Sequence, residues 1–347
     1  MSGSKGSVFR SSLAALSMLA FAATLAVPAA AQNQKFFRIA SGSTGGTFFP
    51  MAGILANAIS NPPGSRPCNK GGSCGVPGLI AIAQSANGSV ANVNAVESGN
   101  IESALVTSSV AGWAYAGTGL FAGKPKMKKL RAIATLFPEH FQVVVPKGSP
   151  VKSIHDLKGR KISAGGQGSA GNASMNLIFG LAGIDVAKDI RVEYMGFSQA
   201  ANHLRDGQLD AIITLSGYPT GAVSQVATTI GARLLPIPAD VIKKVVQEAP
   251  SFAPGVVPGG TYEGLNEDVA TLAAGAQWIT NESTDAGFVY ELTKALWNKK
   301  TKKLFRNGHA KGKAVSIETA MDGIGIPLHP GAVRFYKEHG IKTPAIN

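Results

Sequence analysis

The strongest constraint on the fold is a repeated alternation of short apolar, β-branched runs with longer amphipathic runs, punctuated by glycine. In the first part of the chain it predicts strands at 36–41, 79–84 and 101–107, and helices at 47–60, 89–98 and near Val110. Strand–helix–strand units place consecutive strands in parallel, with the helices on the faces of the sheet. We therefore expect an α/β fold with a parallel, doubly wound sheet.

A second series of the same kind begins after Pro146. It predicts strands at 161–164, 191–195, 211–215 and 233–237, and helices at 172–181, 198–205 and 220–229. The rest, from Ala239 onward, reads as mostly helical and is expected to return to the first series. This predicts a discontinuous lobe 1 (32–145 plus 236–347) and an inserted lobe 2 (146–235). The two connections, near 141–145 and 235–238, would leave a hinged cleft between the lobes.

The first 31 residues predict a secretory signal peptide. Lys5 and Arg10 precede an apolar run at 13–27, and Ala29-Ala30-Ala31 form a small-residue cleavage site before Gln32. The apolar run has about 15 residues, short of the roughly 20 that a membrane-spanning helix needs. We expect cleavage near Ala31 and a periplasmic mature chain.

The composition is basic, with 33 Lys and Arg against 20 Asp and Glu and a formal charge of +13. Nucleic-acid binders concentrate Lys and Arg on one face with interleaved aromatic residues. Here the dense clusters are confined to 124–131 and 294–313. We interpret them as solvated helix ends and turns, with attraction to an anionic membrane or acidic partner as the alternative. We expect a monomer that does not bind nucleic acid.

The two cysteines, Cys68 and Cys74, lie in a Gly/Pro-rich stretch at 61–78. In an oxidising compartment this spacing favours a disulfide that pins the loop. A zinc site is the alternative, but it needs a second cysteine pair or a nearby histidine cluster. The six histidines show no metal-ligand spacing, so we expect no metal and interpret them as surface or structural residues.

Three loops follow predicted strands and carry glycine or hydroxyl residues: 41–47, 107–109 and 165–172. In open parallel sheets, ligands bind beyond the carboxyl ends of the strands, where helix N-termini present unpaired amides. The hydroxyls and glycines of these loops could hold a carboxylate. For the first loop taken alone, a tight turn with Ser/Thr capping is the competing interpretation.

The third loop also matches a dinucleotide-binding fingerprint. Gly166, Gly168 and Gly171 open a predicted helix, and Glu193 stands about 20 residues further on. An exported protein has no evident supply of a free nicotinamide cofactor. Ser169 lacks the first glycine of a hydrolase nucleophile elbow, and no carboxylate pair is marked out for acid–base chemistry. We expect a binding protein without a cofactor; an exported α/β enzyme or a nucleotide binder using this loop is the alternative.

An ordered set of motifs resembles the TAXI family, the extracytoplasmic solute-binding receptors of TRAP transporters. The motifs are Ser43 to Phe48, Gly88 to Val90 with Asn92, Leu130 to Ala134, Asp156 to Gly159, Asp206 to Ala211, Met321 to Gly323 and Ile326 to Gly331. The resemblance implies a two-lobed, type II periplasmic-binding-protein-like fold that closes on its ligand. It also implies a membrane TRAP permease as partner and a small acidic ligand, such as a glutamate-like amino acid or a dicarboxylate.

Carried over to this sequence, the resemblance implies a set of ligand contacts. They are Ser43, Thr44, Thr47, Thr107, Ser108, Gly168, Ser169, Asn172, Ser216 and Gly217. Relatives often carry Gln-Ser-Asp where this chain has Thr107-Ser108-Ser109, which removes one acidic side chain from the expected cleft. Arg131, Arg160 and Arg233 are candidates for a carboxylate clamp, although we interpret them as surface residues. An adhesin that uses the basic surface is a third possibility.

Overall fold

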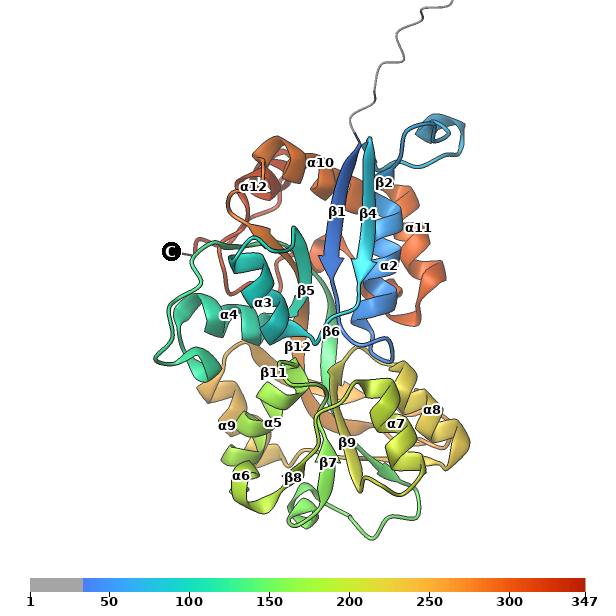
Figure 1. Ribbon diagram of the computed structural model, residues 1–347, viewed down its shortest axis with the longest axis vertical. Helices are drawn as coiled ribbons and strands as arrows, with labels where there is room; N and C mark the ends of the chain where they lie inside the picture. The colour runs from blue at the N-terminus through green and yellow to red at the C-terminus, as the bar shows by residue number, and fades with distance from the viewer. Residues whose placement is uncertain (1–33, 347) are drawn as a thin grey trace, which may run out of the picture. The chain divides into compact units, whose positions relative to one another are not determined.

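The computed structural model describes residues 34–346 (Figure 1). The expected signal peptide, residues 1–31, lies outside these residues. Within 34–346, no helix combines the length and the apolar character needed to cross a membrane.

The upper half of Figure 1 is built on the first strand–helix series. Its strands β1 (Lys35–Ala40), β4 (Leu79–Gln84) and β5 (Ser103–Thr107) pair in parallel in the order β4-β1-β5. Its helices are α2 (Phe48–Ile59), α3 (Ser89–Glu97) and α4 (Ser108–Ala116). The predicted elements of this half are confirmed to within two residues at nearly every end, because apolar periodicity and flanking glycines agree there.

The lower half is built on the second series. Its strands are β7 (Lys161–Ser163), β8 (Arg191–Val192), β9 (Ala211–Ser216) and β10 (Ala232–Leu235), and its helices are α5 (Ala170–Leu181), α6 (Val186–Asp189), α7 (Phe197–Arg205) and α8 (Gly221–Thr229). Strand β7 pairs in parallel with both β8 and β9. In Figure 1, α5 and α6 lie on one side of these strands and α7 and α8 on the other.

Two long antiparallel strands join the halves: β6 (Leu130–Pro146) and β12 (Val269–Asn281). Strand β6 pairs with β12 up to His140, and from there with β9 and then β10. Strand β12 pairs with β11 (Phe252–Val257) at its start and with β5 near its end. The result is one ten-stranded mixed sheet, so the expectation of an all-parallel sheet was wrong.

The last part of the chain adds helices α9 (Ala239–Glu248), α10 (Ala286–Leu296), α11 (Lys299–Gly308) and α12 (Pro330–Glu338). The prediction that this region is mostly helical missed β11 and β12. The middle of β12, Ala273-Ala274-Gly275-Ala276, consists of small residues that lie between neighbouring strands. Its composition therefore resembles that of a helix.

The lobe limits of 32–145, 146–235 and 236–347 stay a prediction. Helix α9 contacts α5 of the second series as well as β11. Ile237 N–H donates to the Ala270 carbonyl, so the chain still lies beside the start of β12 after residue 235. The segment after residue 235 therefore still contacts the second series and the start of β12.

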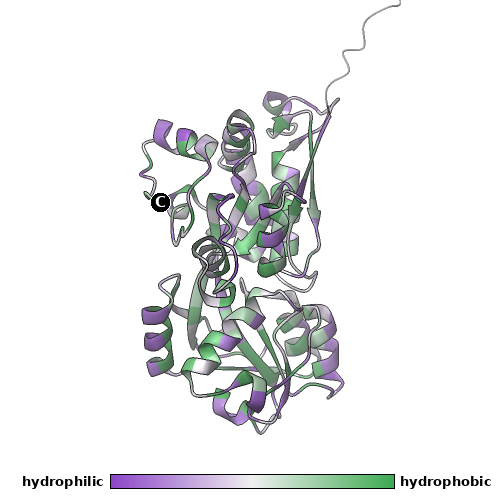
Figure 2. Ribbon diagram, turned by 60° about the vertical axis from the view of Figure 1, so that its left-hand side comes forward, coloured by the Kyte–Doolittle hydropathy of each residue, from purple (hydrophilic) through white to green (hydrophobic). Residues whose placement is uncertain are grey.

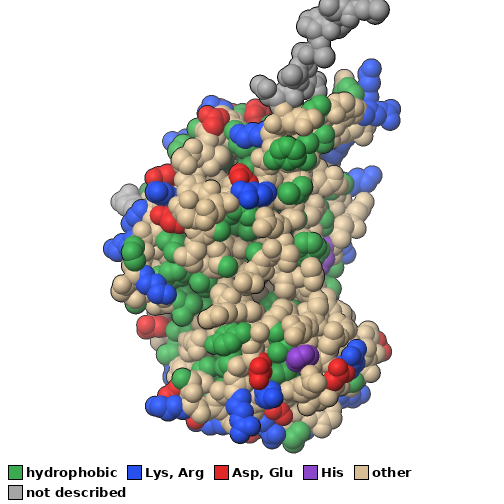
Figure 3. All heavy atoms as spheres, in the orientation of Figure 1, with side chains coloured by type: hydrophobic (Ala, Val, Ile, Leu, Met, Phe, Trp, Pro, Cys, Tyr) green, Lys and Arg blue, Asp and Glu red, His purple; other side chains and the backbone are tan. Residues whose placement is uncertain are grey.

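The apolar core lies on both faces of the sheet, and Figure 2 shows hydrophobic strands with helices whose outer faces are hydrophilic. One cluster surrounds Trp278 and Phe37 under α2, α10 and α12. Another, around Phe141 and Phe179, continues from the upper into the lower half. In Figure 3 the Lys and Arg side chains gather mainly over the two ends of the molecule, and the waist between them carries few charges on this face.

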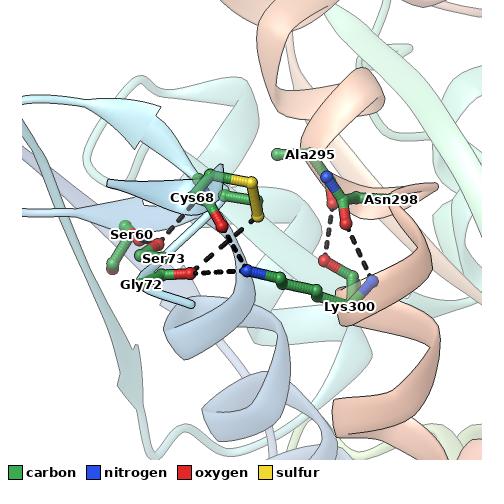
Figure 4. The surroundings of a disulfide bond; sticks show 10 residues. Ser60, Cys68, Gly72, Ser73, Ala295, Asn298 and Lys300 are labelled. Carbon is green, nitrogen blue, oxygen red and sulfur yellow. Dashed lines mark hydrogen bonds between the residues drawn. A yellow bond between two sulfur atoms is a disulfide. The ribbon is translucent and has the colours of Figure 1, made fainter. Parts of the chain in front are cut away.

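The predicted disulfide is present. Cys68 and Cys74 are bonded with their Cα atoms 4.8 Å apart, in the loop between β2 (Ser60–Asn61) and β3 (Val76–Pro77). Figure 4 shows Lys300, at the start of α11, donating from Nζ to the carbonyls of Cys68 and Gly72. This ammonium anchors the loop to the body of the protein.

Candidate ligand-binding site

A cavity of 70 Å³ lies where strands of both halves end. From the upper half it is lined by residues of the loop 42–48, by 86–89 and by Thr107. From the lower half it is lined by residues within 165–171, by Gly196 and Phe197, and by Leu215 and Ser216; Glu139 of β6 completes the wall. The loops among these segments follow β1, β4, β7 and β8, and Thr107, Leu215 and Ser216 are the last residues of β5 and β9, as the sequence predicts for a ligand site in an α/β sheet.

Helices α2, α3, α5 and α7 begin at the wall of this cavity. Each helix N-terminus carries partial positive charge and N–H groups that have no partner inside the helix. The N–H groups of Ser89 and Ala170, the first residues of α3 and α5, have no hydrogen-bond partner in the part of the chain that the structure describes. The site is therefore suited to an anionic group such as a carboxylate.

Ten residues were expected to contact ligand, and five of them line the cavity. Those five are Ser43, Thr47, Thr107, Ser169 and Ser216. The other five, Thr44, Ser108, Gly168, Asn172 and Gly217, are not part of its wall. Ser108 Oγ instead accepts a hydrogen bond from Gly275 N–H at 3.1 Å. Ligand contact by any of the ten stays a prediction.

Several of the cavity hydroxyls already bind protein groups. Ser43 Oγ accepts from Phe197 N–H at 3.1 Å, and the Thr47 hydroxyl donates to the Gly217 carbonyl, so both bridge the two halves. Ser169 Oγ caps α5 by accepting from Asn172 N–H at 3.1 Å, and it donates to the Ala164 carbonyl at 2.8 Å. These hydroxyls hold the loops around the cavity in place.

Backbone hydrogen bonds also cross between the halves. Val90 N–H donates to the Gly168 carbonyl at 2.9 Å, and Ala222 N–H donates to the Gly45 carbonyl at 3.0 Å. Glycine is required at 45, because a Cβ there would lie 2.7 Å from the backbone nitrogen of Ser198. The structure thus has the two halves in direct contact around the cavity.

Sequence reasoning missed Glu139. Its side chain is 1% exposed, lies on β6 and forms part of the cavity wall. Oε2 accepts a hydrogen bond from the Thr107 hydroxyl at 2.7 Å, whereas Oε1 has no hydrogen-bond partner among residues 34–346. Burial raises the pKa of Glu139 to about 8, although the Thr107 bond and the charge of Lys311 oppose that rise. The available signal was the one carboxylate of a mostly apolar strand, next to His140 and close to Gln142.

Lys311 lies near Glu139, in the turn Ala310–Ala314, without a direct ion pair to it. The prediction that the basic cluster 294–313 is solvated was wrong for this residue, which is 6% exposed. Its Nζ lies 3.6 Å from the centre of the Tyr218 ring, a favourable cation–π contact. Burial lowers the pKa of Lys311 to about 8, against the charge of Glu139. Burial and Lys311 together lower the pKa of His140 to about 4.

A second buried polar network surrounds Gln142, which lies three residues after Glu139 on β6. Its Nε2 donates to Thr220 Oγ1 at 3.1 Å, and its Oε1 accepts from the Tyr262 hydroxyl. The Tyr262 oxygen in turn accepts from Thr220 N–H at 3.0 Å. Every polar atom of the Gln142 side chain has a protein partner, so this network is complete without a ligand.

The dinucleotide alternative fits this cavity poorly. Gly166 and Gly171 line it, and a Cβ on Gly171 would lie 2.7 Å from the Ala164 carbonyl, a close helix–strand contact that the fingerprint also requires, so the size of the cavity decides the comparison. Pockets for drug-sized ligands measure roughly 300–1,000 Å³. A 70 Å³ cavity has room only for a much smaller molecule.

The three arginines that the sequence offers as candidates for a carboxylate clamp lie outside the cavity. The guanidinium of Arg131 pairs with Glu282, that of Arg160 with Asp210, and that of Arg233 donates to the carbonyls of Ser149 and Val151. None of these arginines is part of the cavity wall. Residues 34–346 contain no group of three or more His, Cys, Asp or Glu side chains placed to hold a metal ion.

Comparison with known proteins gives a family and distant structural likenesses. The sequence pattern of the NMT1-like family matches residues 39–340. The alkanesulfonate-binding protein SsuA from Xanthomonas axonopodis pv. citri bound to MOPS is 16% identical, with a TM-score of 0.47 over 87% of this chain and 83% of that one. An ancestral arginine-binding protein bound to arginine is 15% identical, with a TM-score of 0.44 over 88% of this chain and 98% of that one. The architecture described above is a mixed α/β fold whose two halves share one sheet.

Proposed function

Because this chain belongs to the NMT1-like family, we propose that it is an extracytoplasmic solute-binding receptor that captures a small organic acid or amino acid by closing its two halves. The observation that carries the proposal is the cavity between loops of both halves, with unpartnered N–H groups at the starts of α3 and α5. Such a site holds a small carboxylate without supplying a nucleophile or an acid–base pair. In this proposal the protein is not an enzyme.

The transport role follows from the same proposal. The motifs shared with the TAXI family support a TRAP-type permease in the membrane as the partner that receives the ligand. Residues 1–31 support export to the periplasm with cleavage near Ala31. The receptor would work as a monomer, because one chain supplies both walls of the cavity.

Thermal unfolding of residues 32–347, first stripped of ligand by unfolding and refolding, tests the receptor function. The panel contains amino acids, dicarboxylates, keto acids, sugars and nicotinamide nucleotides. A ligand present at about 100 times its Kd should add roughly 2.7 kcal/mol to the free energy of unfolding. We expect such a rise with one class of small carboxylate, without turnover of that compound.

A pair of variants links this stabilisation to the cavity. Asn87 is exposed at the cavity wall, and Asn87→Trp should fill the entrance and abolish the ligand-induced shift. Asn94→Trp places the same side chain at an exposed site of α3 away from the wall and should leave the shift intact. Stabilisation by nucleotides alone would contradict the receptor proposal, and so would a shift that survives in Asn87→Trp.

A further inference from the structure

We propose that Glu139 is a specificity-determining residue that receives the ammonium group of an α-amino acid whose carboxylate lies at the N-termini of α3 and α5. The inference rests on the proposed receptor function and deepens it, because it selects amino acids over acids that lack an amine. Three features of the cavity carry it: an acceptor oxygen without a partner, a hydrogen-bond chain that favours the ionised carboxylate, and donors placed elsewhere on the wall.

The first feature is the free oxygen. Glu139 is 99% removed from solvent, yet only Oε2 is hydrogen-bonded, and the side chain belongs to the cavity wall. Oε1 is not one of the fully buried unpartnered side-chain atoms, so it keeps contact with the cavity, where a donor can reach it. A ligand ammonium in the cavity would supply both the missing donor and the missing positive charge.

The second feature is the direction of the hydrogen bonds behind Glu139. Ser89 Oγ accepts from Thr107 N–H at 2.9 Å and lies 3.2 Å from Thr107 Oγ1. With the Ser89 hydroxyl donating to Thr107, the Thr107 proton is directed to Glu139 Oε2 at 2.7 Å. Donation to a carboxylate stabilises its charged form. This chain therefore prepares Glu139 to become an anion when a cation arrives.

The third feature is that the same wall carries groups suited to a negative and to a positive charge. The unpartnered N–H groups of Ser89 and Ala170 belong to helix N-termini, which attract a carboxylate. Glu139 lies on strand β6, a different element of the wall. A small zwitterion would present its carboxylate to the helix N-termini and its ammonium group to Glu139. A dicarboxylate would instead bring a second carboxyl group against Glu139.

Binding of the amino acid is then linked to the release of a proton from Glu139. The charged and titratable groups around Glu139 are Lys311 from the turn Ala310–Ala314 and His140 on the same strand. With a pKa of about 8, Glu139 is mostly protonated in the unliganded protein at pH 7. The incoming ammonium ionises the carboxyl group, and its proton passes to solvent. Binding should release close to one proton at pH 7 and tighten about tenfold per pH unit below the pKa.

The test is isothermal titration calorimetry with matched pairs: L-glutamate against glutarate, and L-alanine against propionate. Titration of wild-type protein at pH 7 in phosphate and in Tris, whose ionisation enthalpies differ, counts the protons released. We expect an amino acid to bind at least about tenfold more tightly than its amine-free partner, with proton release. The number of protons released is measured on the wild-type protein, so this result does not depend on whether any variant folds.

Glu139→Gln should abolish proton release and weaken amino-acid binding at least about tenfold, while binding of the amine-free acid is unchanged. Glu193→Gln removes a carboxylate outside the cavity wall and should behave as wild type. Equal affinity within each pair, or binding without proton release, would overturn the role of Glu139 and leave the receptor function standing. If neither these probes nor any compound of the thermal panel binds, both proposals fall.

Discussion

Glu139 and Gln142 lie three residues apart on the same strand, and both are buried polar side chains. Gln142 has protein partners for its donor and its acceptor, supplied by Thr220 and Tyr262. Glu139 has one protein partner and one free oxygen at a cavity. Burial and polarity alone therefore do not distinguish a structural residue from a binding residue. Unused hydrogen-bonding capacity that faces a cavity does.

The comparison also separates what each residue does for stability. Gln142 stabilises the crossing from the upper to the lower half, because its partners come from β9, the start of α8 and the segment before β12. Glu139 carries a desolvation cost in the empty protein. We expect substitutions at the two sites to have opposite signatures.

The largest effect is expected for Gln142→Leu. It leaves the buried Tyr262 hydroxyl without its acceptor and removes one of the hydrogen bonds of Thr220 Oγ1, which should lower the free energy of unfolding by about 3 kcal/mol. Urea unfolding at pH 7 measures this loss. Gln208→Leu, at an exposed glutamine without a side-chain partner, is the matched control. A loss no larger than that of the control would remove the distinction between the two residues.

The second-largest effect is expected for Glu139→Gln, which should remove a pH-dependent contribution to the free energy of unfolding. Because the pKa of Glu139 is raised from 4.5 to about 8 in the folded state, its contribution is fully present below pH 4.5 and is lost as the pH rises through 8. Between pH 6.5 and 8, wild type should lose about 2 kcal/mol relative to Glu139→Gln.

This window separates Glu139 from His140. The pKa of His140 is lowered from 6.5 to about 4, so its contribution increases with pH only between these values. The pKa of Lys311 is lowered from 10.5 to about 8, so its contribution also increases with pH, opposes that of Glu139 and begins near the upper limit of the window. Urea unfolding of both proteins at pH 6.5, 7.25 and 8 gives the difference. Parallel curves for the two proteins would show that Glu139 is ionised throughout.

The smallest effect is expected for Thr107→Val. It removes the hydroxyl that donates to Glu139 and should cost about 1 kcal/mol of unfolding free energy. Because this hydrogen bond lowers the pKa of Glu139, its loss should move the pH dependence of amino-acid binding upward. Calorimetry between pH 6.5 and 8.5 follows that shift, with Thr118→Val at an exposed site as the control. An unchanged midpoint would mean that Thr107 does not stabilise the Glu139 anion.

Local pattern was enough for much of this molecule. The elements of the first and second series, the glycine loops at the ends of strands and the Cys68–Cys74 bridge were all predicted from residues close in sequence. These features depend on periodicity, turn residues and a short cysteine spacing, which act over a few residues. The same local patterns also predict that a ligand site lies at these loops.

Tertiary structure decided the rest. Strand β12 joins the two halves by pairing with β5 and β6, strands that lie more than 120 residues earlier in the chain. Glu139 faces a cavity, and Lys311 is buried near it, because segments more than 170 residues apart fold against each other. The environment of a carboxylate is set by those distant neighbours through desolvation and charge. The sequence by itself determined the α/β series and its loops, and only the packing of the two halves decided that one carboxylate oxygen of Glu139 faces the cavity without a protein partner.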